Sequence, residues 1–325
     1  MKREVQSRWD RDPVLDKDGK PVVARITEKD VELFKLLERY TVLPADYLRA
    51  FLGGNQRAFS ARLNLLYRSP NRYIDRPEQQ RKNADANYRY LVYQLDDKGA
   101  DHLRSLGCPV NRKKIKRNFA HELMVSEIAA SIELGTREHP NVKLIQWRDI
   151  LASDKVPTRT KEQANPATIP FVMEGEVHHL MADGDPFVLQ PTEHQFMFFP
   201  GFEADCATEP LDAADTSRTS IRQKFRAYLH VMENRVYASH FGSSTFMVPF
   251  ITTNETRMKS MMALLESMKP GQHARRFLFK HIPAFTSYEK PAPPTGHMLT
   301  EPWHRVGNTP FTLTNPNTSK EKAAA

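Results

Sequence analysis

The order of secondary-structure patterns along residues 120–285 is the feature that most limits the folds open to this chain. One helical pattern is followed by three strand patterns, then a helix and a strand, then a further helix and strand. Strands rich in β-favouring residues that alternate with amphipathic helices indicate a sheet flanked by helices. We therefore predict an α/β domain with a mixed sheet over these residues.

The first third of the chain has a different and mainly helical pattern. Thr27 precedes a helical segment and is followed three residues later by Asp30, which is the spacing of a capping box. Further helices are predicted over LPADYLRAFLGG and NQRAFSARLNLLYRS, and the strand-like run YRYLVYQL follows a basic stretch. Three short helices before a basic β-hairpin are typical of a winged helix-turn-helix domain, whose third helix enters the major groove of DNA. A small helical domain with a protein-binding surface fits the same pattern.

Positive charge is concentrated in this first third. Residues 1–119 hold 26 Lys or Arg and 16 Asp or Glu, a net charge of +10, whereas the remaining residues carry −2. Localised positive charge favours nucleic acid as a partner, because neutralised phosphates release condensed counterions. We therefore expect double-stranded DNA as the partner, bound by a homodimer if the site is palindromic. A solvated basic face is the alternative interpretation.

Seven residues are candidates for contact with DNA. Four lie on the outer, polar face of the third predicted helix and are expected in the groove: Arg57, Ser60, Asn64 and Arg68. Three lie in the basic stretch that follows and are expected on backbone phosphates: Arg76, Arg81 and Lys82. The basic run from Arg112 to Arg117 is either a further phosphate contact or a solvated linker.

Acidic side chains in FEADCATEP, residues 202–210, suggest a catalytic site in the second part. Glu203 and Asp205 are two residues apart on a predicted strand and therefore project to the same face. Asp185 is expected to meet them, and three converging carboxylates favour Mg²⁺. Lys224, on the next helix, would stabilise the transition-state charge of a phosphodiester. The alternative is that these acids are only the polar end of a buried strand.

Signals for several other function classes are absent from the sequence. It contains neither GxxxxGK[ST] nor GxGxxG, so we expect no nucleotide cofactor. Cys108 and Cys206 are far apart and outside any CxxC spacing, which argues against a disulfide framework and a cysteine-based zinc site. The sequence has no apolar leader and no uncharged window of membrane-spanning length, so we expect a cytoplasmic protein that does not associate with membranes.

Taken together, the motifs resemble the replication-relaxation family of mobile-element proteins. The segments that carry this resemblance are ITEKDVELFKLLERYTVLPADYLRAFL, DGDPFVL and FEADCATEPLDAADTSRTSIRQKFRAYL. The second half is also similar to a PD-(D/E)XK nuclease core, with Glu-Ala-Asp where an active enzyme usually has acid-x-Lys. The resemblance implies a DNA-binding protein of a plasmid, phage or integrative element that acts in replication, relaxation or transfer, with a degenerate nuclease-like domain. The alternative is an Mg²⁺-dependent DNA endonuclease or nickase targeted by its winged helix domain.

These observations predict an α+β chain of five parts. The parts are a flexible lead-in (1–25), a winged helix-turn-helix domain (26–110), a basic linker (111–119), a restriction-endonuclease-like α/β domain (120–285) and a partly disordered C-terminal extension (286–325). Within the extension, Trp303 and Phe311 are expected to fold back onto the sheet.

Overall fold

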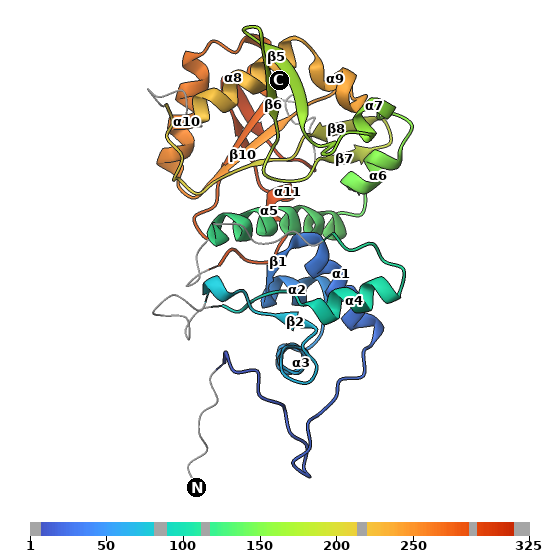
Figure 1. The fold of residues 1–325 in the computed structure, drawn as a ribbon. Helices are drawn as coiled ribbons and strands as arrows, with labels where there is room; N and C mark the ends of the chain where they lie inside the picture. The colour runs from blue at the N-terminus through green and yellow to red at the C-terminus, as the bar shows by residue number, and fades with distance from the viewer. Residues whose placement is uncertain (1–7, 81–89, 112–117, 213–219, 286–290, 315–325) are drawn as a thin grey trace. The chain divides into compact units, whose positions relative to one another are not determined.

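The chain is an α+β protein that divides into two compact units (Figure 1). The computed structural model describes residues 8–80, 90–111, 118–212, 220–285 and 291–314. Unit 1 comprises Met1–Ala130 and Thr286–Thr295, and unit 2 comprises Ser131–Phe285 and Gly296–Ala325. The division between the units falls within the long helix α5 (Phe119–Glu138). Most of the basic linker predicted at 111–119, residues 112–117, lies outside the described residues.

Unit 1 is built from short helices and a small antiparallel sheet. In chain order its elements before α5 are α1 (Glu28–Tyr40), β1 (Val42–Pro44), α2 (Ala45–Leu52), α3 (Gln56–Tyr67), β2 (Ile74–Asp75), η1 (Glu78–Gln80), β3 (Val92–Leu95) and α4 (Asp97–Ser105). β3 pairs with both other strands, in the order β1-β3-β2. The predicted capping box is present, because Thr27 and Asp30 each accept a hydrogen bond from the other's backbone amide. It fixes the start of α1.

Part of the lead-in predicted at 1–25 contacts the rest of unit 1, whereas its first seven residues lie outside the described residues. The Arg11 guanidinium forms ion pairs with Asp75 and Asp96. The Tyr67 hydroxyl donates a hydrogen bond of 2.8 Å to the Trp9 carbonyl. A polar segment gives no hydrophobic pattern, so the sequence could not indicate these partners, which lie more than fifty residues away along the chain.

Unit 2 contains a mixed sheet against which α8 and α10 pack. Its elements after α5 are β4 (Lys143–Ile145), α6 (Trp147–Ala152), α7 (Thr158–Lys161), β5 (Ile169–Met173), β6 (Glu176–Leu180), β7 (Phe187–Thr192), β8 (Gln195–Phe199), β9 (Glu203–Asp205), α8 (Ile221–Glu233), α9 (Val236–Phe241), β10 (Val248–Thr252), α10 (Glu255–Ser267), η3 (Gly271–Arg276), β11 (Phe277–His281), α11 (His297–Thr300), β12 (Trp303–Arg305) and β13 (Asn308–Phe311). Within the described residues the main sheet has five strands in the order β13-β12-β11-β10-β9. Its β9, β10 and β11 are parallel to one another, and β12 and β13 are antiparallel. The strands β4-β7-β8 and the hairpin β5-β6 form smaller sheets.

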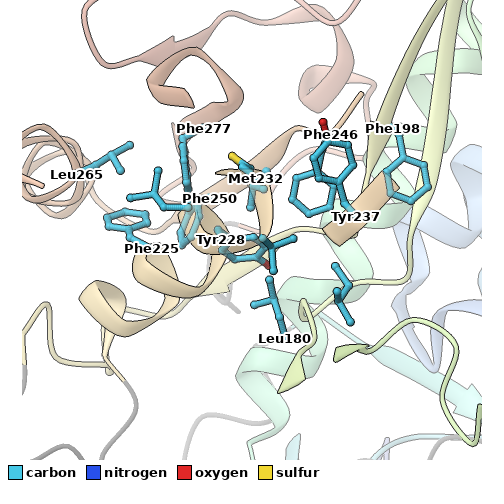
Figure 2. Close-up of a cluster of buried hydrophobic side chains, with 14 of the residues drawn as sticks. Leu180, Phe198, Phe225, Tyr228, Met232, Tyr237, Phe246, Phe250, Leu265 and Phe277 are labelled. Atoms are coloured by element: carbon cyan, nitrogen blue, oxygen red, sulfur yellow. The ribbon is translucent and has the colours of Figure 1, made fainter. Parts of the chain in front are cut away.

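Aromatic side chains fill the core of unit 2 and fix α8 on the main sheet (Figure 2). The ring of Phe225 on α8 lies with its centroid 4.9 Å from that of Phe250 and 5.6 Å from that of Phe277, both edge-on. Edge-to-face pairs add stabilisation beyond the burial of apolar area. Because Lys224 precedes Phe225 in α8, this packing also sets the position of Lys224 near β9.

Two sequence predictions about strands have different outcomes. Trp303 and Phe311 are buried, and their strands β12 and β13 join the main sheet as predicted. The strand predicted to carry Glu203 and Asp205 is only the short β9, which a break at Pro200-Gly201 separates from the preceding β8. Gly201 has φ of +125°, and a Cβ there would lie 2.1 Å from the Gly184 carbonyl oxygen. Only glycine permits this break, because the turn that contains Gly184 packs directly against it.

Candidate functional site

The predicted acids lie on β9, an edge strand of the main sheet. Glu203 is 2% exposed and Asp205 is 5% exposed. β9 is parallel to β10, and Asp205 is the register partner of Thr252. A buried carboxylate is costly unless it is paired and hydrogen-bonded, so the partners of these two acids decide what the site can do.

Two residues of α8 satisfy the Glu203 carboxylate. The Lys224 Nζ lies 2.9 Å from Glu203 Oε2 and 3.0 Å from Glu209 Oε2. The Tyr228 hydroxyl donates a hydrogen bond to Glu203 Oε1. Because Lys224 and Tyr228 are four residues apart, they lie on one face of the helix. Lys224 therefore reaches the acid strand, which the sequence alone could not determine.

The ionisation of both donors matches their role. Although burial acts against it, the carboxylates of Glu203, Asp183 and Glu209 raise the pKa of Lys224, which stays an ammonium. Burial raises the pKa of Tyr228 well above its ordinary value, and the Glu203 charge raises it further. The tyrosine hydroxyl thus stays protonated and continues to donate to Glu203.

Asp205 is held by an arginine from another helix. Arg257, in the first turn of α10, places Nε 3.0 Å from Asp205 Oδ2 and Nη2 3.1 Å from Oδ1. The Thr252 hydroxyl donates a further hydrogen bond of 2.8 Å to Oδ2. The bidentate geometry makes this a strong, directional pair, and it engages both oxygens of the carboxylate.

The third acid whose charge acts on this cluster is Asp183, which lies two residues before the predicted Asp185. Asp185 is exposed, whereas the Asp183 carboxylate is close enough to act on the pKa values of Glu203 and Lys224. The Asp183 amide donates to the Phe202 carbonyl, and Asp183 Oδ2 accepts from the Ala204 amide at 2.9 Å. These bonds turn Asp183 toward β9. The sequence DGD offers two acids, and only the geometry of the turn selects between them.

The described residues do not fit the magnesium site that a nuclease-type domain implies. No group of three or more His, Cys, Asp or Glu side chains among them is arranged to hold a metal ion. Mg²⁺ requires oxygen ligands in near-octahedral geometry. The oxygens of Glu203 and Asp205 instead accept hydrogen bonds from Lys224, Tyr228 and Arg257. The cluster has the geometry of an internal ion-pair network.

The predicted groove residues, three on α3 and Arg68 directly after it, fall into two sets. Arg57 and Ser60 are exposed and Asn64 is half-buried. Arg68 is buried, and its guanidinium donates to Asn64 Oδ1 at 3.1 Å and to the Asp12 carbonyl at 3.2 Å. Arg68 is therefore engaged within unit 1, where the segment before α1 covers this end of the helix.

Arg76, predicted to contact phosphate, is also buried and is engaged within unit 1. Its guanidinium carbon lies 4.0 Å from the centroid of the Tyr67 ring, and Nη2 donates to the Tyr93 hydroxyl at 3.2 Å. A cation on an aromatic face in a buried site stabilises the fold. Arg81 and Lys82 lie outside the described residues.

The comparisons with known proteins bear on both units. The replication-relaxation family model matches residues 34–245, which is more than half of the chain. No curated protein and no solved structure matches the chain. Across the described part of the chain, none of the helices has the length and apolar character needed to cross a membrane. The family match begins within α1 and extends past β9 and α8, so it includes both α3 and the acid cluster. The chain belongs to the replication-relaxation family.

Proposed function

We propose that this chain binds double-stranded DNA and acts in the replication or relaxation of the DNA of a mobile element. Its family supports the process. The element order of unit 1, with a helix, a strand, two helices and then two strands that pair antiparallel, supports a winged helix-turn-helix domain. In such a domain the third helix, here α3, lies in the major groove.

The exposed N-terminal half of α3 is the observation that carries this proposal. Arg57, Ser60 and Ala61 are exposed, while Phe59 and Leu63 are buried in unit 1. Recognition helices contact base edges mainly through residues of this half. Within the described residues the exposed Arg57 has no acidic partner, so its charge is available to a ligand. The guanidinium fork suits a guanine edge or a phosphate.

In this proposal unit 2 serves assembly or recruitment, and a homodimer would place two copies of α3 on a palindrome. The geometry of β9 favours this role over cleavage, because each buried acid is already neutralised by a cation of the same unit. A nuclease-like core whose acids have become an internal network would keep its fold and lose its chemistry.

Arg57→Ala tests the proposal. A duplex selected by the wild type from a randomised pool and a random duplex would each be titrated by fluorescence anisotropy at fixed salt. We expect the variant to lose about 1–3 kcal/mol of binding free energy on the selected duplex and less on the random one. Arg226→Ala is the matched control, because it removes the same charge from an exposed ion pair with Glu174 in unit 2.

Two results would change this conclusion. An equal loss on both duplexes would place Arg57 on the phosphate backbone. A wild-type chain that binds no duplex at low salt would refute DNA binding altogether.

A further inference from the structure

Unit 2 contains a cluster of positive charge that no acid neutralises. Most cations of α8, α10 and β11 have an acidic partner within 3.3 Å: Arg222, Lys224, Arg226, Arg257, Lys259 and Lys280. Arg275 and Arg276 of η3 and Arg305 of β12 have no ion-pair partner within the described residues. We call these three arginines the η3 patch. Residues after 119 carry a net charge of −2, so the patch is local and does not reflect a generally basic unit.

Neutral groups hold two of the three guanidinium groups in place. Arg276 Nη1 donates to the Tyr237 hydroxyl at 3.0 Å. Arg305 Nε donates to the Thr309 carbonyl at 3.0 Å, and its guanidinium carbon lies 4.4 Å from the centroid of the Phe311 ring. These contacts fix the orientation of the side chains and leave their charge uncompensated. The patch is therefore ordered in advance for an anionic ligand.

The cations of the patch act on one another. η3 packs against β12, which brings Arg275 near Arg305. Burial and then Arg275 lower the pKa of Arg305. Burial and then Arg276 lower the pKa of the neighbouring His273, and the exposed Glu233 opposes this effect. Like charges at this range disfavour one another, and an anion between them would remove that penalty.

We propose that the η3 patch is a second DNA-contacting surface, which binds backbone phosphates through Arg275, Arg276 and Arg305 without reading the base sequence. Arginine presents a planar fork of donors that matches a phosphate in bidentate fashion. This inference rests on the proposed DNA binding and extends it from α3 to unit 2. It assigns sequence recognition to α3 and sequence-independent affinity to the patch.

The salt dependence of DNA binding by the intact protein tests this assignment. The association constant for a random duplex would be measured by anisotropy between about 50 and 200 mM salt, for the wild type and for R275Q/R305Q. The slope of log K against log salt is negative, and each lost phosphate contact reduces its magnitude by about 0.9. We therefore expect the magnitude of the slope to be smaller by about 1.8 in the double variant. R275K/R305K keeps both charges and should keep most of the slope.

R222Q/R226Q is the matched control. It also removes two positive charges from unit 2, but these are already paired with Asp212 and Glu174, so its slope should equal that of the wild type. Equal thermal unfolding midpoints would verify that each variant is folded. If R275Q/R305Q does not fold, the exposed Arg275→Gln alone should lower the slope by about 0.9.

The possible outcomes separate the two proposals. A slope that falls only in R275Q/R305Q supports the η3 patch. An unchanged slope, or an equal fall in the control, overturns the patch while the effect of Arg57→Ala still supports DNA binding by α3. A fall that appears only on an RNA duplex of the same sequence also overturns it as a DNA surface. A wild-type chain that binds no duplex overturns both proposals.

Discussion

The acid cluster on β9 and the basic surfaces on α3 and η3 differ in how their charges are satisfied. Glu203 and Asp205 are buried, and each is paired with a cation of the same unit. Arg57 and Arg275 are exposed and have no acidic partner within the described residues. A buried charge that is paired within the protein interacts mainly with its partner, whereas an unpaired surface charge can attract a ligand of opposite charge. The residues that look most like a catalytic motif are thus internal, and the residues open to a ligand have the weaker sequence signal.

Breaking the Glu203–Lys224 pair should give the largest effect. Lys224→Met leaves the Glu203 carboxylate buried without its cation, so we expect the free energy of unfolding of unit 2 to fall by about 3–5 kcal/mol. The double variant Glu203→Gln/Lys224→Met should recover part of this loss, because the buried Glu203 charge is gone while the less buried Glu209 still lacks its lysine. Urea unfolding followed by the fluorescence of Trp147 and Trp303, in a Trp9→Phe background, would measure the change in unit 2.

Arg222→Met provides the control on the same helix. Its ion pair with Asp212 is exposed, so its loss should cost about 0–1 kcal/mol. If Lys224→Met costs no more than this control, the acid cluster does not depend on internal neutralisation.

The thiol of Cys206 reports on the charges of the cluster and should give the next largest effect. Burial, followed by the carboxylates of Asp205 and Asp183, raises its pKa to about 11. The thiolate is the reactive form, so in a Cys108→Ser variant the rate of alkylation should reach half of its maximum near pH 11. An unperturbed thiol reaches this midpoint at about pH 8.5. Asp183→Asn removes one negative charge and should lower the midpoint of this profile.

The profile has a clear contrary result. If the midpoint of the profile lies at the ordinary pKa of a thiol and does not change in Asp183→Asn, the carboxylates near β9 are not charged as the geometry indicates. Measurement of unfolding at each pH would verify that the folded protein is being sampled.

Local patterns in the sequence predicted much of this molecule. The capping box at Thr27 and Asp30 depends on residues three apart, and the runs of β-favouring residues that form β10 and β11 depend on neighbours. Such signals are contained in short windows. For the same reason the sequence alone places Glu203 and Asp205 on one strand and on one face of it.

These local patterns could not identify residue pairs that come from distant elements of the chain. Arg257 meets Asp205 across 52 residues, and nothing in its own segment identifies it as a partner. Tyr228 had a weak signal, because it follows Lys224 by one helical turn. Arg68 and Arg76 look like DNA contacts in the sequence, yet the segment before α1 and the Tyr67 ring bury them. Basic composition reports the number of charges, and only packing decides which of them face a ligand.

Nuclease activity that depends on the acid cluster would contradict the contrast between internal acids on β9 and ligand-binding arginines on the surface. Supercoiled plasmid would be incubated with Mg²⁺ or Mn²⁺ and either the wild type or Glu203→Gln. We expect the same extent of nicking with both proteins, because Lys224 and Tyr228 already engage the Glu203 carboxylate. Asp205, which stands where the resemblance to a PD-(D/E)XK nuclease would lead one to expect lysine, is likewise engaged by Arg257. Glu203→Gln keeps the size of the side chain, and Arg222→Gln controls for changes at the surface. Metal-dependent nicking that is lost in Glu203→Gln and kept in Arg222→Gln would make β9 a catalytic strand that rearranges on binding DNA.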